Sequence, residues 1–86
     1  MKYRLAEDYL WKEVNDRIVV LHFDSGKYYT LNATGSLIWK GIMNGLSQAE
    51  ILDQMCEEYD IDRQTAADDT EKIINDFESK HFLIKL

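Results

Sequence analysis

The sequence predicts an α+β fold of the winged helix-turn-helix type, in which a three-stranded antiparallel sheet is followed by three helices. Two observations predict this fold. The spacing of apolar residues changes from strand-like to helical near Asn32, and the last two predicted helices are joined by a short turn at 60–62. With 86 residues, no proline and no internal repeat, residues 1–86 are expected to form one domain. The order of residues 1–8 is left open.

Three short segments before Asn32 have the composition of β-strands. The middle segment is rich in β-branched residues, so we expect it at the centre of an antiparallel meander. The pair Asn15-Asp16 and the segment around Gly26 supply the turns, since these residues tolerate the positive φ that tight hairpins require. The expected strands cover residues 9–14, 17–23 and 28–31.

Three helices are expected after Asn32, each with one apolar side. The first runs from a cap at Asn32 or Thr34 to about Asn44, the second follows the capping box at 47–50, and the third covers 64–80. The final apolar segment, 82–84, is expected to pack against the core. The buried sides should contain Ile38, Trp39, Ile42 and Met43 in the first helix, Ile51, Leu52, Met55 and Tyr59 in the second, and Ala66, Thr70, Ile73, Ile74 and Phe77 in the third.

The composition argues against secretion, membrane insertion and catalysis. The single cysteine, Cys56, excludes an internal disulfide and fits a reducing compartment. Residues 1–8 lack the apolar stretch of a signal peptide and no segment is long enough to span a membrane, so we expect a cytoplasmic protein. His22 and His81 have no ligand spacing to Cys56, and the serines have no triad context. We therefore predict no enzyme activity, no metal site and no cofactor.

The charge is distributed unevenly along the chain. Residues 1–49 contain 6 basic and 5 acidic residues, whereas residues 50–86 contain 4 basic and 11 acidic ones. A winged-helix DNA-binding regulator is an alternative of another class, but the third helix would present Asp68 and Asp69 to phosphate. Nucleic acid is therefore not the expected partner.

The third predicted strand, 28–31, is an edge strand with unpaired main-chain groups. It contains no charged residue and no proline, the devices that usually protect an edge. One interpretation is an ordinary short edge strand, and another is pairing with a second copy to form a homodimer. The functional interpretation is β-augmentation, in which an extended peptide adds as a further strand.

Several segments together carry a family resemblance. They are 20–32, 35–39, 45–51, Asp69-Thr70 with Ile73, Ile74 and Phe77, and 82–84. In this order and spacing, residues 11–84 resemble the PqqD-like family of precursor-peptide recognition elements. The resemblance implies a non-catalytic winged helix-turn-helix domain. It also implies that the leader segment of a ribosomally made precursor peptide binds along the third strand, against the third helix.

Carried over residue by residue, the resemblance implies two groups of peptide-binding residues. The acidic pair Asp69 and Asp76 would suit a basic residue in the leader. The strand residues are Tyr28, Tyr29, Thr30 and Leu31, and the helix residues are Asp69, Lys72, Ile73 and Asp76.

One departure concerns the hairpin turn. Members that serve pyrroloquinoline quinone synthesis usually have a Pro-Glu pair there, whereas this chain has Asp24-Ser25-Gly26. The turn and the Ile38-Trp39 pair look more like stand-alone domains of lasso-peptide clusters, in which a leader peptidase is the enzyme served. A PqqD-type chaperone for a radical-SAM peptide-modifying enzyme is the alternative within the family.

Overall fold

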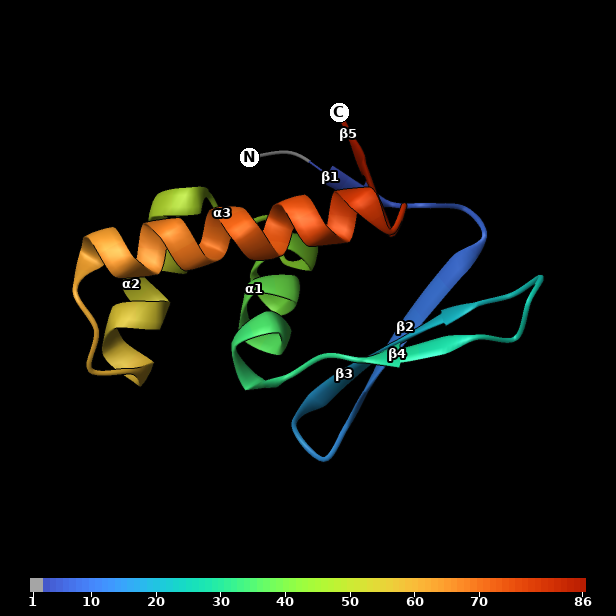
Figure 1. Cartoon of the computed structure of the whole chain (residues 1–86), viewed down its shortest axis with the longest axis horizontal. Coiled ribbons are helices and arrows are strands. Elements are labelled where there is room, and N and C mark those ends of the chain that lie inside the picture. The colour runs from blue at the N-terminus through green and yellow to red at the C-terminus, as the bar shows by residue number, and fades with distance from the viewer. Residues whose placement is uncertain (1–2) are drawn as a thin grey trace.

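The computed structural model describes residues 3–86 and confirms the predicted fold class (Figure 1). A three-stranded antiparallel sheet, a two-stranded sheet and three helices form a winged helix-turn-helix-like domain. The elements are β1 (Tyr3–Leu5), β2 (Tyr9–Val14), β3 (Arg17–His22), β4 (Tyr28–Thr30), α1 (Ala33–Met43), α2 (Gln48–Glu58), α3 (Arg63–Ser79) and β5 (Leu83–Lys85).

The predicted meander is present, in the order β2-β3-β4. Asn15 and Asp16 both have positive φ, 52° and 64°, as the two central residues of a type I′ hairpin turn do. Gly26, with φ of 71°, lies in the turn between β3 and β4. β3 and β4, which are the second and third predicted strands, each end one residue before the predicted limit, at His22 and Thr30.

The sequence pattern did not predict the two-stranded sheet. β1 pairs antiparallel with β5, with Arg4 opposite Ile84, and the Ala6 N–H donates to the carbonyl of Phe82 over 2.9 Å. Residues 3–5, whose order the sequence left open, are thus held by the other end of the chain. Met1 and Lys2 lie outside the described residues.

The helix caps follow the sequence closely. The Asn32 side chain accepts a hydrogen bond from the Gly35 N–H over 2.8 Å, and Ser47 and Glu50 form the predicted reciprocal box. Asp62 caps α3, which therefore begins at Arg63, one residue before the predicted start. Hydrogen bonds from the main-chain N–H and the side chain of Thr65 lower the pKa of the Asp62 carboxyl below its usual value.

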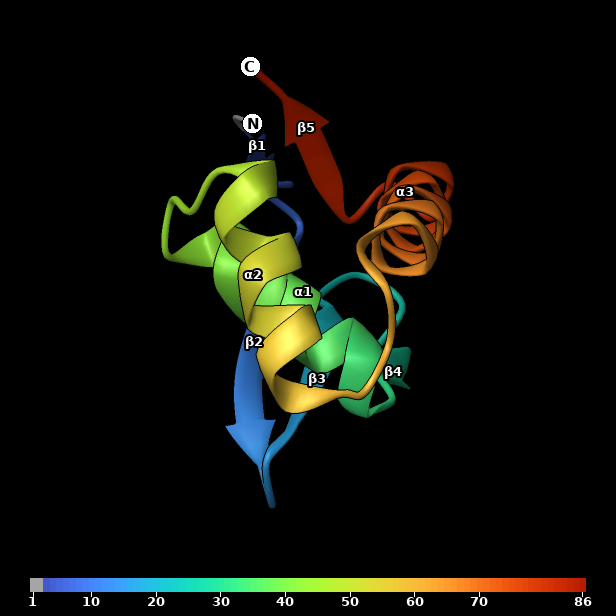
Figure 2. The same ribbon diagram turned by 90° about the vertical axis from the view of Figure 1, so that its left-hand side faces the viewer.

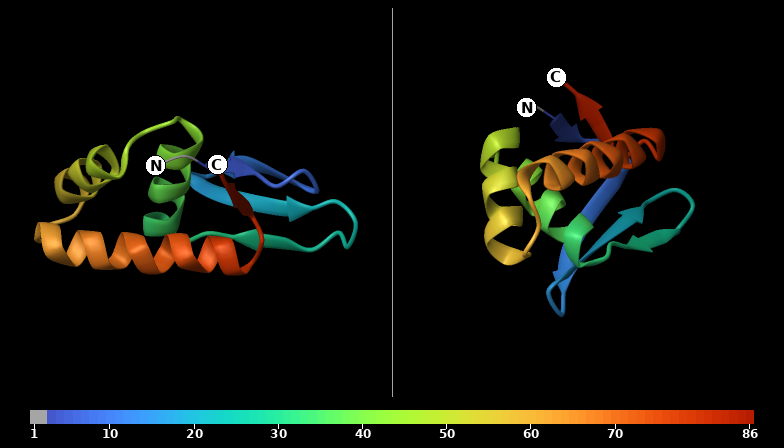
Figure 3. Two further views of the ribbon diagram at one scale, coloured as in Figure 1. Left: turned by 90° about the horizontal axis from the view of Figure 1, so that it is seen from above. Right: turned by 60° about the vertical axis from the view of Figure 1, so that its left-hand side comes forward.

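The core lies between the three-stranded sheet and the helices. Ile18 and Val20 of β3 are fully buried against Trp39 of α1, and Phe77 and Phe82 complete the centre. All three helices lie on one side of this sheet (Figures 2 and 3). The predicted buried sides are correct except at their margins, where Met43, Tyr59 and Ile73 are only half-buried. In the final segment, Phe82 and Leu83 are buried but Ile84 is exposed.

No helix within residues 3–86 combines the length and the apolar character needed to cross a membrane.

Candidate functional site

The open edge of β4 is the feature that the predicted site requires, and it is present. Within the described chain, β4 pairs with β3 and with no other strand. The Leu31 N–H donates to the Ile18 carbonyl over 2.8 Å, and the Lys27 carbonyl accepts from the His22 N–H over 2.9 Å. Because main-chain groups alternate in direction along an antiparallel strand, those of Tyr28 and Thr30 point away from β3. They are the donors and acceptors that a further strand would use.

The side chains of this segment divide between two faces of the sheet. Tyr29 faces the core side, and its ring centroid lies 5.1 Å from that of the buried Phe82. Leu31 is half-buried and packs on the core. Tyr28, by contrast, is 70% exposed on the opposite face. Each of the four predicted strand residues is therefore accessible at least in part.

Helix α3 runs on the same side of the molecule as β4 (Figures 2 and 3). One flank of the helix faces β1, because the Tyr3 hydroxyl donates to the Glu78 carboxylate over 2.7 Å. Ile73 precedes Glu78 by five residues and is thus rotated by about 140° around the helix. Seen nearly along α3, β1 and β4 lie to different sides of this helix, so the flank of Ile73 is the one nearer β4 (Figure 2). There it is half-buried and packs on the core.

The remaining predicted helix residues are placed differently from one another. Asp69 is half-buried next to Ile73 on the helix surface, whereas Asp76 is exposed and forms an ion pair with Lys80 over 2.7 Å. Lys72 lies farther round the helix and borders a hollow of about 280 Å³ with Asp68. The helix therefore brings Ile73, Asp69 and Asp76 toward the strand side, and Lys72 toward the outer surface.

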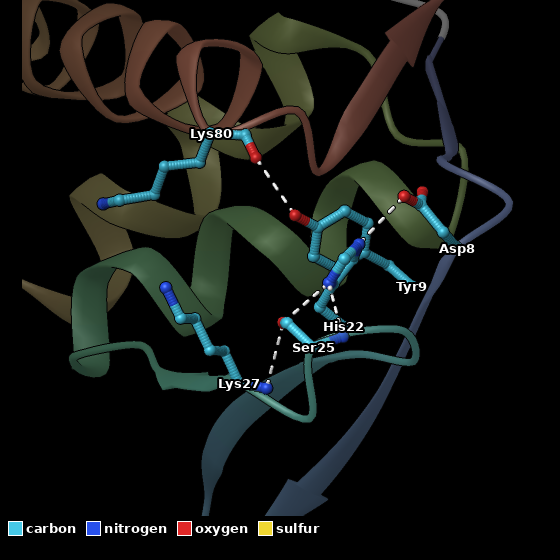
Figure 4. Close-up of polar contacts among 6 residues, drawn as sticks. All are labelled: Asp8, Tyr9, His22, Ser25, Lys27 and Lys80. Atoms are coloured by element: carbon cyan, nitrogen blue, oxygen red, sulfur yellow. Dashed lines mark hydrogen bonds and ion pairs between the residues drawn. The ribbon is translucent and has the colours of Figure 1, made fainter.

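A polar cluster that the sequence analysis did not anticipate holds the turn before β4 (Figure 4). His22 Nε2 lies 3.0 Å from Asp8 Oδ2, and His22 Nδ1 lies 2.8 Å from Ser25 Oγ. The Ser25 N–H donates to His22 Nδ1 over 3.3 Å. The Lys27 N–H in turn donates to Ser25 Oγ over 3.2 Å. These bonds tie the hairpin tip to the residues before β2.

Two residues of this cluster, together with the neighbouring Asp24, are the candidate metal ligands of the described chain. Ligand atoms of Asp8, His22 and Asp24 all lie within 4.8 Å of one another. Both carboxylates are exposed, however, and each ring nitrogen of His22 already has a hydrogen-bond partner. The hydrogen bonds of His22 to Asp8 and Ser25 explain why these groups lie together, because they support the turn.

A larger hollow lies away from the predicted site. It measures about 620 Å³ and is bordered by α1, α2 and the start of β3, with Arg17, Lys40, Glu57 and Tyr59 among its lining residues. None of the eight predicted peptide-binding residues contributes to its lining. Its charged lining does not resemble the apolar surface offered by Tyr29, Leu31 and Ile73.

Most of the chain matches the model of a known protein family. Residues 17–83 match the family model described as coenzyme PQQ synthesis protein D (PqqD). The chain belongs to the PqqD family. The matched segment of this PqqD-family protein starts at β3 and ends at the beginning of β5, so it contains both β4 and α3. No curated protein matches the sequence.

Two solved structures resemble the PqqD-family chain over nearly its whole length. One is TbiB1 in complex with the TbiA(β) leader peptide, with 32% identity, coverage of 96% of this chain and 94% of that chain, and a TM-score of 0.83. The other is lasso peptide synthetase B1 complexed with the leader peptide. It has 24% identity, coverage of 98% and 99%, and a TM-score of 0.88, and it shows a common fold.

Proposed function

We propose that this PqqD-family protein binds the leader segment of a ribosomally synthesised precursor peptide by strand addition at β4. The observation that carries the proposal is the open edge, where the main-chain groups of Tyr28 and Thr30 point away from the sheet. The likeness to TbiB1, which is 32% identical to this chain and whose structure contains a bound leader peptide, supports a leader peptide as the ligand.

The main chain and the side chains of a docked leader strand would make different kinds of contact. Main-chain pairing with Tyr28 and Thr30 would supply affinity that depends little on the leader's sequence. Alternate side chains of the leader would point to the core side, where Tyr29, Leu31 and Ile73 offer partly exposed apolar surface. Preference for apolar leader residues at every second position follows from this arrangement.

Charge would add a second preference. Asp69 and Asp76 lie on the strand side of α3 and suit a Lys or Arg of the leader. Asp76 is already paired with Lys80, so a basic leader residue would compete for that carboxylate. The half-buried Asp69 is expected to contribute more, because a partly desolvated charge is less screened by water.

The domain itself would act as a presenter. Its role would be to raise the local concentration of the precursor near a maturation enzyme, which for short tethers reaches the millimolar range. A lasso-type leader peptidase is the favoured enzyme. The Asp24-Ser25-Gly26 turn, in place of a Pro-Glu pair, supports that choice over a radical-SAM enzyme.

Titration of a fluorescently labelled leader peptide from the adjoining precursor gene tests the proposal. We expect a Kd below about 100 μM, equivalent to roughly 5.5 kcal/mol. Hydrogen exchange should show the amides of Tyr28 and Thr30 becoming protected when the leader binds, whereas the Leu31 amide, already bonded to Ile18, should be protected throughout. A scrambled leader is the control. Absence of binding, or protection confined to another surface, would contradict the proposal.

A further inference from the structure

A side chain closes the last main-chain pair before the open edge of β4. In a regular antiparallel hairpin, the two residues of a hydrogen-bonded pair exchange two main-chain bonds. The His22 N–H donates to the Lys27 carbonyl over 2.9 Å, whereas the Lys27 N–H donates to Ser25 Oγ over 3.2 Å. The His22 carbonyl accepts from the Gly26 N–H over 3.0 Å. Ser25 therefore completes the pairing immediately before Tyr28, the first residue of β4.

The Ser25 hydroxyl is held in turn by the His22 ring. Ser25 Oγ lies 2.8 Å from His22 Nδ1, and the other ring nitrogen, Nε2, lies 3.0 Å from Asp8 Oδ2 (Figure 4). The His22 side chain is 22% exposed, so its hydrogen bonds are partly shielded from water, which strengthens them. Because the ring is bonded at both nitrogens, it fixes the hydroxyl relative to the residues before β2.

The His22 ring also connects the turn to the end of α3. The Tyr9 ring packs against that of His22, with centroids 4.7 Å apart. The Tyr9 hydroxyl donates to the carbonyl of Lys80, the residue that caps the C-terminal end of α3, over 3.3 Å (Figure 4). The contacts of His22 thus join the start of β4 to the end of α3, the two elements that border the proposed leader site.

The conformation of Tyr28 depends strongly on this turn. Three residue pairs join β4 to β3, and the pair formed by Leu21 and Tyr28 lies next to the turn. Without the Ser25 hydroxyl, the Lys27 amide would lose its partner and the main chain of Tyr28 would sample more conformations. A leader strand would then have to order Tyr28 on binding, and that loss of conformational freedom would lower its affinity.

We propose that His22 is a positioning residue of the leader site. Together with Asp8 and Ser25, it holds the main chain of Lys27 and Tyr28 in the conformation that accepts an added strand. His22 acts through these residues and does not itself contact the leader. The inference rests on the proposed function, because it takes the leader to pair with β4. Since the three side chains act through hydrogen bonds, leader affinity should not depend on a metal ion.

The test compares leader affinity with stability in variants of the full chain. His22→Phe keeps a planar ring beside Tyr9 but removes both ring nitrogens, Ser25→Ala removes the hydroxyl, and Ser25→Thr retains a hydroxyl. Glu13→Ala is the matched control, because it breaks the pair of Glu13 with Lys40, also 3.0 Å long, at the other end of the same sheet. Fluorescence anisotropy gives leader affinity, urea unfolding gives stability, and hydrogen exchange reports on single amides.

We expect His22→Phe and Ser25→Ala to weaken leader binding about three- to tenfold. The urea midpoint of Ser25→Ala should stay close to that of wild type, because Ser25 is exposed. In the free Ser25→Ala protein the Lys27 amide should exchange faster, whereas the Leu31 amide keeps its protection. Ser25→Thr should recover leader affinity, and Glu13→Ala should bind the leader within about twofold of wild type. A general loss of stability would not produce this pattern.

Three results would overturn the inference. Wild-type leader affinity in both His22→Phe and Ser25→Ala would show that the turn does not need this support. Equal weakening by Glu13→Ala would show that any loosening of the sheet has the same effect. Loss of leader binding when EDTA is added to wild type would mean that Asp8, His22 and Asp24 hold a metal ion. In each case the wild-type leader titration without chelator would still succeed, whereas a wild-type protein that bound no leader would contradict the proposed function itself.

Discussion

Tyr29 of β4 and Phe82, which follows α3, place their ring centroids 5.1 Å apart with an interplanar angle of 60°. Phe82 also makes an edge contact with Tyr9 at 5.2 Å and lies 6.1 Å from Trp39. One buried ring thus joins β4 to β2, to α1 and to the C-terminal end of α3. The position of the candidate strand relative to the helix depends on this packing.

Replacing Phe82 by alanine should destabilise the whole domain. The side chain is 1% exposed, and truncation of a buried Phe typically costs about 3–5 kcal/mol in the free energy of unfolding. Urea unfolding followed by circular dichroism measures the loss. Phe82→Leu should lose less because it leaves a smaller cavity, and Tyr28→Ala, at an exposed position, should change stability by no more than about 0.5 kcal/mol. A wild-type urea midpoint for Phe82→Ala would show that the aromatic cluster does not support the fold.

Replacing Thr30 by proline should weaken leader binding by roughly tenfold, the equivalent of about 1.4 kcal/mol, because it removes a donor at the open edge. No hydrogen bond within the sheet is lost, since the Thr30 N–H points away from β3. Thr30→Val keeps the N–H and a β-branched shape, and it should bind the leader like wild type. Anisotropy titration compares the three proteins, and thermal unfolding verifies that each is folded. Equal affinity for Thr30→Pro would mean that the leader does not pair at this residue.

Reversing charge on the strand side of α3 should invert the preference for leader charge. The double variant Asp69→Lys with Asp76→Lys is expected to bind a basic leader about three to ten times more weakly at low salt and an acidic leader more tightly, with both effects reduced at high salt. The double variant Asp68→Lys with Glu71→Lys makes the same charge change beside the smaller hollow, which Lys72 borders. It should have a smaller effect on leader affinity. Equal effects from the two double variants would indicate only general electrostatic attraction.

The contact between Tyr3 and Glu78 predicts a loss of stability in alkali. Burial of the Tyr3 ring, together with the hydrogen bond and negative charge of Glu78, raises the pKa of the phenol from 10.0 to about 12. Because the folded-state pKa lies above the unfolded one, this stabilisation is complete below pH 10 and is lost as the pH rises to 12. The urea midpoint of wild type should therefore fall more steeply between pH 10 and 12 than that of Tyr3→Phe.

An exposed tyrosine provides the control for the alkaline experiment. Tyr28→Phe removes a phenol that is 70% exposed, so its midpoint should follow wild type over the same pH range. If Tyr3→Phe also followed wild type, the hydrogen bond that joins β1 to α3 would not contribute to stability.

Signals that act within a few residues made most of the fold predictable. The turn pair Asn15-Asp16, the cap at Asn32 and the box formed by Ser47 and Glu50 each bind or shape main chain close by in sequence. The alternation of Ile18 and Val20 likewise marks the buried side of β3 without reference to the rest of the chain. The edge position of β4 followed from the order of the strands.

Long-range contacts were not predictable in the same way. The pairing of residues 3–5 with 83–85 joins opposite ends of the chain, and three-residue strands carry too little periodicity to reveal it. The bond of His22 to Asp8, and the division of Asp69, Asp76 and Lys72 around α3, depend on how distant segments pack.

The sequence by itself determined where β2, β3, β4 and the three helices lie, to within about a residue at most ends, since caps, turns and alternation are local interactions. Only the tertiary structure decided which main-chain groups of β4 are open and which flank of α3 faces it. It also decided that one face of the sheet stays uncovered. The reason is physical, because these properties depend on the register and packing of segments that are brought together only when the chain folds.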